Sequence, residues 1–120
     1  MEQHFLKNID FQTVLPLETL VEYKPGQVVS RTLAQGKTVS LTLFAFAAGE
    51  EISSHSSSGD AMVYMLDGAA EVTIGTEKYQ LKKGEMIVMP AGIPHALLAV
   101  EQFKMFLVVV FSLGSNDAVR

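Results

Sequence analysis

Short apolar and β-branched runs alternate along this chain with turns rich in glycine, proline and charged residues, roughly every ten residues. This spacing is typical of a β-sandwich or a β-barrel. Between two of the runs, Gly75 and Thr76 predict a tight hairpin turn, because glycine readily takes the positive φ that such turns need. The predicted strands span residues 28–33, 38–46, 61–66, 69–74, 78–81, 86–89, 95–100 and 103–111.

No segment shows a sustained helical period. Residues 14–21 could form one helical turn at most, because Pro16 interrupts the run. At 120 residues the chain has the length of one domain, with an N-terminal arm over 1–10 and a tail over 114–120 that is expected to fray. We therefore expect an all-β barrel with little or no helix.

The last predicted strand is unusual, because residues 105–111 are apolar on both faces. A strand with one face in water would alternate apolar and polar residues. One face can fill the barrel, but the other needs a cover, since a flat exposed apolar strand promotes aggregation. We expect a second copy of the chain to cover it in a twofold-symmetric homodimer. The alternative is a cover formed by the N-terminal strands of the same chain.

Charge and cysteine content narrow the possible partners. A net charge of −4 and a pI near 5.2 argue against nucleic acid or an anionic membrane as a partner. The absence of cysteine excludes disulfides, thiolate ligands and cysteine nucleophiles. The first ten residues hold no apolar stretch of the signal-peptide type, and the longest apolar run is too short to span a bilayer. A cytoplasmic protein that binds a small molecule is the expectation.

Two glycine-punctuated segments, 49–68 and 84–99, carry the candidate chemistry. The first places His55 between Gly49 and Gly68, and the second ends its turn at Gly92 shortly before His95. They resemble the two motifs of the cupin family, G-x5-H-x-H-x3-4-E-x6-G and G-x5-P-x-G-x2-H-x3-N. The resemblance implies a double-stranded β-helix, or jelly roll, of the small conserved-barrel type. Cupins include dioxygenases, isomerases, decarboxylases, sugar-binding regulators and storage proteins, so the fold does not select a function.

The metal site that the resemblance implies lacks half of its ligands here. Cupins usually hold a divalent metal with three histidines and a glutamate, whereas this chain has Ser57 and Ala61 at two of those positions. His55 and His95 would hold Fe, Mn, Ni or Zn only loosely, since a metal generally needs three protein donors. Asp60 could replace the glutamate if a bulge near Gly59 turned it inward. Alternatively, the histidines line the barrel mouth with no metal.

Strand parity predicts a small, mostly apolar cavity next to the two histidines. The expected lining residues are Ser57, Ala61, Val63, Met65 and Leu97. An apolar cavity with two convergent polar groups is the usual form of a ligand site. The sequence therefore predicts a ligand-binding barrel, with weak metal dependence left open. The alternatives are a metalloenzyme of dioxygenase or isomerase type with a non-standard third ligand, and metal-free acid–base catalysis by one histidine.

Overall fold

A computed structural model describes residues 3–112 of the chain. Eight strands and one short 3-10 helix make up these residues, in the order η1, β1 to β8. Their bounds are η1 Leu17–Leu20, β1 Val28–Gln35, β2 Val39–Phe46, β3 Glu51–His55, β4 Asp60–Ile74, β5 Glu77–Lys82, β6 Met86–Met89, β7 His95–Leu98 and β8 Phe103–Val110. None of the helices within 3–112 is long and apolar enough to cross a membrane. The tail expected to fray, 114–120, lies outside the described residues, as do the first two residues of the expected arm.

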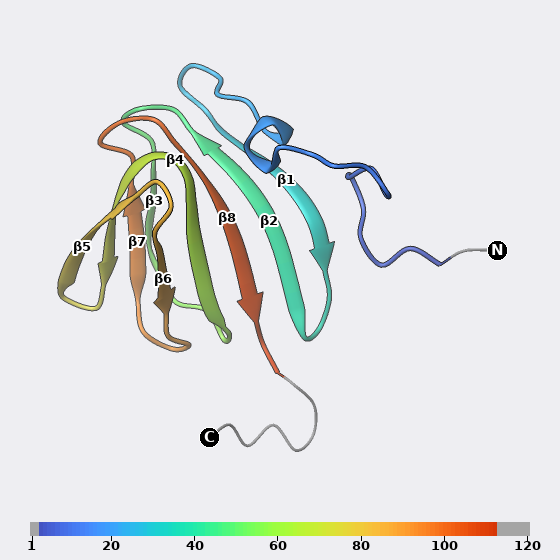
Figure 1. Ribbon diagram of the computed structural model, residues 1–120. Helices are drawn as coiled ribbons and strands as arrows, with labels where there is room; N and C mark the ends of the chain where they lie inside the picture. The colour runs from blue at the N-terminus through green and yellow to red at the C-terminus, as the bar shows by residue number, and fades with distance from the viewer. Residues whose placement is uncertain (1–2, 113–120) are drawn as a thin grey trace.

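The strands form a strongly curled antiparallel sheet, and Figure 1 shows β1, β2, β8 and β4 side by side in it. One wall has the order β1-β2-β8-β4-β6, and the other has the order β3-β7-β4-β5. Both walls share β4, whose first half pairs with β6 and β8 and whose second half pairs with β5 and β7. The long strand thus joins the walls and closes one side of the barrel.

The predicted break at Gly68 is a bend inside β4 and does not end the strand. The register of β4 against β8 shifts between Met65 and Asp67, and Gly68 has a φ of +75°. A Cβ at this position would lie 2.1 Å from the Gln102 carbonyl oxygen. Glycine therefore lets β4 turn from one wall to the other while passing tightly over the start of β8.

The other predicted strands agree with the structure to within two residues at each end, and the Gly75 hairpin joins β4 to β5 as expected. The all-β prediction is confirmed, and the helical turn expected within 14–21 is η1. Strand β3 was not predicted. Its sequence EISSH contains one apolar residue, Ile52, so it has no hydrophobic alternation to reveal it.

Two apolar clusters lie on opposite faces of the first wall. The barrel cluster fills the interior between the walls and includes Phe46, Val63, Met65 and Phe103. Phe46 and Phe103 stack there with ring centroids 4.4 Å apart. The N-terminal cluster lies outside, where η1 and its flanking residues pack on β1 and β2 and against Phe106 of β8.

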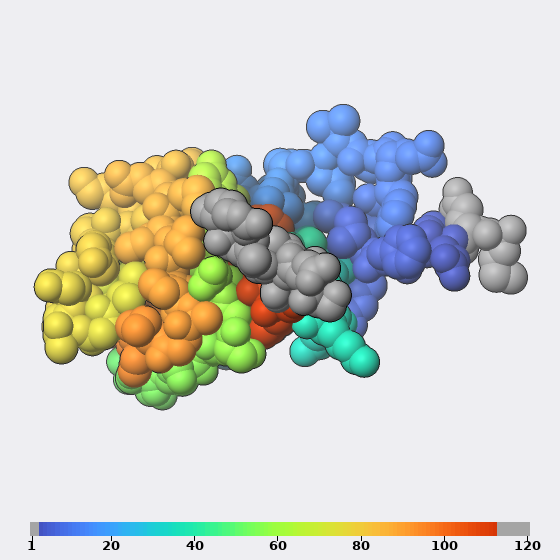
Figure 2. Space-filling view, turned by 90° about the horizontal axis from the view of Figure 1, so that it is seen from below, coloured from blue at the N-terminus to red at the C-terminus, as the bar shows by residue number. Residues whose placement is uncertain are grey.

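The N-terminal segment of the same chain thus covers part of the outer face of the last strand. Phe106 is partly buried beneath it, whereas Val110 near the other end of β8 remains 36% exposed. Figure 2 shows the N-terminal segment to one side of the barrel strands. The described residues therefore leave part of the outer face uncovered.

Candidate functional site

Strands β3 and β7 bring the two motif histidines together. The strands pair in antiparallel register, with Ile52 opposite Leu97 and His55 opposite His95. A register shift lies between Ile52 and His55. The imidazole rings meet edge to face with centroids 4.5 Å apart. The two residues predicted from motif spacing are therefore cross-strand neighbours at one end of the second wall.

His55 forms the exposed half of the pair. Its Nδ1 lies 3.0 Å from the backbone carbonyl oxygen of Ser53. Because a carbonyl oxygen can only accept, Nδ1 carries the hydrogen, and Nε2 of the neutral ring is a hydrogen-bond acceptor. The local fold of β3 thus fixes the tautomer of His55 and leaves a basic nitrogen for a ligand.

His95 forms the buried half, with 4% of its surface exposed. Burial is the main cause that lowers the pKa of His95, and the nearby His55 lowers it further, while the Ile93 backbone opposes the shift. Among the described residues, its Nδ1 has no hydrogen-bond partner. A buried polar atom without a partner is costly, so its persistence at a cavity favours a role in binding.

A cavity of about 120 Å³ lies beside the histidine pair. It is lined by Ile52, His55, Ser57, Ala61, Met89, His95, Leu97, Met105, Leu107 and Val109. Apart from the two imidazoles and the Ser57 hydroxyl, every side chain in this lining is apolar. The site is therefore a small hydrophobic chamber with its polar groups gathered on the side of β3 and β7.

The structure brings together three of the five predicted lining residues. Ser57, Ala61 and Leu97 line the cavity, and the Ser57 hydroxyl also accepts a hydrogen bond from the Gly59 amide at 3.1 Å. Val63 and Met65 point inward as strand parity predicts, but both are fully buried in the barrel cluster and do not line the cavity. The cavity thus occupies only the end of the barrel near His55.

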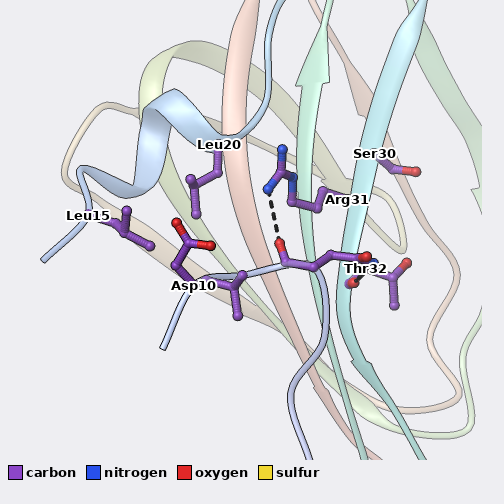
Figure 3. A pocket seen from close by; sticks show the side chains of 8 residues that line it. Asp10, Leu15, Leu20, Ser30, Arg31 and Thr32 are labelled. Carbon is purple, nitrogen blue, oxygen red and sulfur yellow. Dashed lines mark hydrogen bonds between the residues drawn. The ribbon is translucent and has the colours of Figure 1, made fainter. Parts of the chain in front are cut away.

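A second, larger hollow lies away from the histidines, between the N-terminal segment and β1 (Figure 3). Its volume is about 750 Å³. Two charged residues, Asp10 and Arg31, line it, and Arg31 donates a hydrogen bond from Nη1 to the Asn8 carbonyl oxygen at 2.9 Å. Arg31 therefore holds the N-terminal segment against β1, and the histidine cavity is the better candidate for chemistry.

Comparison with known proteins establishes the family. The family model described as a cupin domain matches residues 42–111, which span both histidines and the cavity. This chain belongs to the cupin family. The cupin fold is also shared by the conserved protein SPY1581 of unknown function from Streptococcus pyogenes, with 48% identity, a TM-score of 0.91 and coverage of 93% of this chain and 98% of that one.

Two further solved structures are similar to this chain. A cupin superfamily protein from Desulfitobacterium hafniense is 34% identical, with a TM-score of 0.85 and coverage of 89% of this chain and 98% of that one. A mutant salicylate 1,2-dioxygenase from Pseudoaminobacter salicylatoxidans, solved in complex with gentisate, is 26% identical with a TM-score of 0.65. It matches 72% of this chain but only 26% of its own.

The donor set of this cupin falls short of a usual metal centre. Within residues 3–112, no group of three or more histidine, cysteine or acidic side chains could hold a metal ion. Asp60, the candidate third ligand, is exposed, and its Oδ1 accepts a hydrogen bond from the Ala91 amide at 2.8 Å. It joins the start of β4 to the turn before β7. Two imidazoles alone do not fit the three protein donors that such a metal generally requires.

Several lining residues were missed from the sequence. Met89 of β6 and three residues of β8, Met105, Leu107 and Val109, line the cavity together with Ile52. Their alternating positions on β8 carried a signal, because residues 105, 107 and 109 share one face of a strand. The sequence of the last strand could not show which of its two apolar faces was the inner one.

Proposed function

We propose that this cupin binds a small, mainly apolar molecule that carries one hydroxyl group. The observation that carries the proposal is the histidine pair beside an otherwise apolar cavity. The Nε2 of His55 can accept a hydrogen bond from the ligand. The neutral form of His95, favoured by burial, lets an uncharged group enter without a desolvated positive charge opposite it.

The cavity volume limits the ligand to about the size of benzene. An engineered apolar cavity of ~150 Å³ is known to hold benzene, whereas drug-sized ligands need ~300–1,000 Å³. At about 120 Å³, the chamber suits a single ring or a short branched chain. We expect this binding to take place in the cytoplasm. A chain without cysteine forms no disulfides, so its folding does not depend on an oxidising compartment.

Phenol, benzene and 1-naphthol test the proposal by size and polarity. Phenol fits the chamber and can donate to His55, so it should raise the melting temperature and shift the amide resonances of Ile52 and Leu97. The binding free energy of benzene should be less favourable by about 0.5–1.5 kcal/mol, the contribution of one hydrogen bond. 1-Naphthol, with two fused rings, should not bind.

The matched variant is His55→Ala, which removes the exposed imidazole and leaves the buried core intact. It should reduce phenol affinity to that of benzene and leave benzene affinity unchanged. If neither phenol nor benzene moves any resonance around the cavity at millimolar concentration, the binding proposal is wrong.

A metal-dependent function is the second candidate, supported by the adjacent imidazoles and by the dioxygenase relative. It would need Fe, Mn, Ni or Zn to bind through His55, His95 and a donor from outside the two motifs. The described residues offer fewer than the three protein donors that such a metal generally needs. After the protein is reloaded with metal, we therefore expect less than one equivalent by plasma mass spectrometry, and the same metal content in a His55→Ala, His95→Ala variant. One equivalent that disappears in the variant would overturn this expectation and favour the metalloenzyme.

A further inference from the structure

The exposed part of the chamber wall lies mainly on one segment of the chain. Most of the lining is buried, and the lining residues with solvent exposure are Ile52, His55, Ser57 and Leu107. All but Leu107 belong to residues 51–58, which comprise β3 and the loop that follows it. We call residues 51–58 the flap. The flap therefore lies between the chamber and solvent, and it carries two of the polar side chains of the chamber, His55 and Ser57.

The flap contributes little apolar surface to the barrel. Its one apolar side chain is Ile52, and its other residues are glutamate, histidine and serine. Among the described strands, β3 pairs only with β7, and the register shift in that ladder passes over residues 53 and 54. Segments with few buried apolar contacts open at a free energy well below that of global unfolding. We therefore expect the flap to open while the rest of the barrel stays folded.

Both ends of the flap are fixed to neighbouring strands. Before it, the Gly49 amide donates to the Ala99 carbonyl oxygen at 2.7 Å, and the Ala99 amide donates to the Glu50 carbonyl oxygen at 2.9 Å. After it, Gly59 is buried, and a Cβ there would lie 2.7 Å from the Val110 carbonyl oxygen. A lid moves by changes of φ and ψ at a few residues at its ends. The flap can therefore pivot between these two points without displacing β4 or β8.

Two hydrogen bonds hold the flap and the start of β4 against the turn before β7. The Gly92 amide donates to the Ser57 carbonyl oxygen at 2.8 Å. The Ala91 amide, one residue earlier, donates to Asp60 Oδ1 at 2.8 Å. Asp60 lies just beyond the flap and does not line the chamber. Its carboxylate therefore keeps the turn in the position from which Gly92 reaches Ser57.

We propose that the flap is a lid over the histidine chamber and that Asp60 latches this lid closed. The inference rests on the proposed function, because a lid affects a ligand that enters the chamber. When the flap is closed, His55 and Ser57 line the chamber, so the acceptor nitrogen of His55 meets the ligand only in the closed state. Opening then sets the rates of entry and exit, whereas the closed state sets the affinity. Asp60 is a positioning residue that acts through Ala91 and the flap.

Amide hydrogen exchange of the full chain tests the lid without any ligand. The reporter is the Gly92 amide, because its bond to Ser57 breaks whenever the flap opens. The reference is the Met65 amide in the buried part of β4, which donates to the Glu85 carbonyl oxygen at 2.9 Å. The Gly92 amide should exchange much faster than the Met65 amide. Low concentrations of urea should hardly change its rate, because a local opening exposes little surface.

Two variants at Asp60 test the latch. Asp60→Ala removes the acceptor, whereas Asp60→Asn keeps an oxygen that can accept from the Ala91 amide. Asp60→Ala should raise the exchange rate of the Gly92 amide about two- to tenfold, as expected for the loss of one hydrogen bond, and leave the Met65 amide unchanged. Asp60→Asn should retain most of the protection. Equal exchange rates of Gly92 and Met65 in the wild type would overturn the lid even if Asp60→Ala fails to fold, and a Gly92 rate that Asp60→Ala leaves unchanged would overturn the latch.

Phenol binding relates the lid to the chamber, with rate constants measured by NMR exchange spectroscopy. Asp60→Ala should raise the association and dissociation rate constants by the same factor. The dissociation constant should stay within about twofold, because the closed state still dominates. A faster dissociation with an unchanged association rate would show that Asp60 supports the bound state alone, which contradicts a lid. If phenol does not bind at all, the proposed function is wrong, whereas the exchange of the Gly92 amide still decides whether the flap opens.

Discussion

The two histidines of the site lie next to each other but differ in environment. His55 is exposed and its tautomer is fixed by the Ser53 carbonyl, whereas His95 is buried and its Nδ1 has no partner among residues 3–112. Burial and the neighbouring ring both oppose a positive charge on His95. The pair can therefore offer one accessible acceptor nitrogen beside a buried ring whose pKa is lowered, a division that two equally solvated histidines would not provide.

This asymmetry predicts a pH dependence of stability. Because the pKa of His95 is lower in the folded state, the unfolded chain binds more protons as the pH falls below about 6.5. The contribution of His95 to the free energy of unfolding should thus be fully present above that pH. It should be lost as the pH falls toward the lowered pKa, by up to about 1.4 kcal/mol per pH unit. Urea unfolding between pH 7.5 and 5 measures the free energy.

Two variants isolate the contribution of His95. His95→Leu should flatten the slope over this range and leave stability at pH 7 nearly unchanged, because an apolar side chain replaces an imidazole whose Nδ1 has no partner among residues 3–112. His4→Ala removes an exposed histidine and should retain the wild-type slope. A slope that survives in His95→Leu would show that another group titrates.

At the residue scale, the sequence predicted the site through motif spacing more than through chemistry. His55 and His95 were located by their distance from the motif glycines, and the structure pairs them directly. Asp60 was a weaker prediction because strand parity already turned it outward, and the structure shows it bonded to the Ala91 amide. The depth of the cavity could not be predicted, since it depends on how side chains from five strands, β3, β4, β6, β7 and β8, pack together.

At the scale of elements, the predictable strands were those with a continuous apolar face. Strand β3 has a single apolar residue, so its existence depends on hydrogen bonds to β7 that no local pattern reveals. Strand β4 was predicted as two strands because glycine usually interrupts a strand. The structure instead uses Gly68 to bend one strand between the walls, and steric contact with Gln102 leaves no space for a side chain there.

The glycines of the two segments that carry the motifs consequently have different physical roles. A Cβ at Gly49 or Gly84 would meet nothing within 4 Å, although both residues have positive φ. At Gly59 the φ is ordinary, but a Cβ would lie 2.7 Å from the Val110 carbonyl oxygen. Turns thus require glycine at the first two positions, and close packing of β4 on β8 requires it at Gly59. Only the turn requirement can be recognised without a structure.

At the scale of the whole molecule, the barrel cluster and the N-terminal cluster share the first wall as a common layer. The N-terminal segment is joined to this wall by polar contacts as well as by its apolar side chains. Tyr23 donates a hydrogen bond to Asp67 Oδ2 of β4 at 2.6 Å, and Lys104 of β8 donates from Nζ to the Glu18 carbonyl oxygen at 2.8 Å. The Lys104 ammonium also lies 5.0 Å from the centre of the Tyr23 ring. These contacts join the N-terminal segment to β4 and β8, two strands of the first wall.

Tyr23→Phe tests this coupling, because it removes one hydroxyl and keeps the ring beneath Lys104. Burial and then the bond to Asp67 raise the pKa of Tyr23, which keeps the hydroxyl protonated as a donor. Losing a hydrogen bond to a charged group should reduce the free energy of unfolding by about 1.5–3 kcal/mol in urea. Tyr79→Phe on the exposed surface of β5 is the matched control and should change it by less than about 0.5 kcal/mol. Hydrogen exchange then locates the loss: if the N-terminal cluster stabilises the whole barrel, protection should fall in β4 and β8 as well as in residues 17–23. A loss confined to 17–23 would show that the cover opens independently of the barrel.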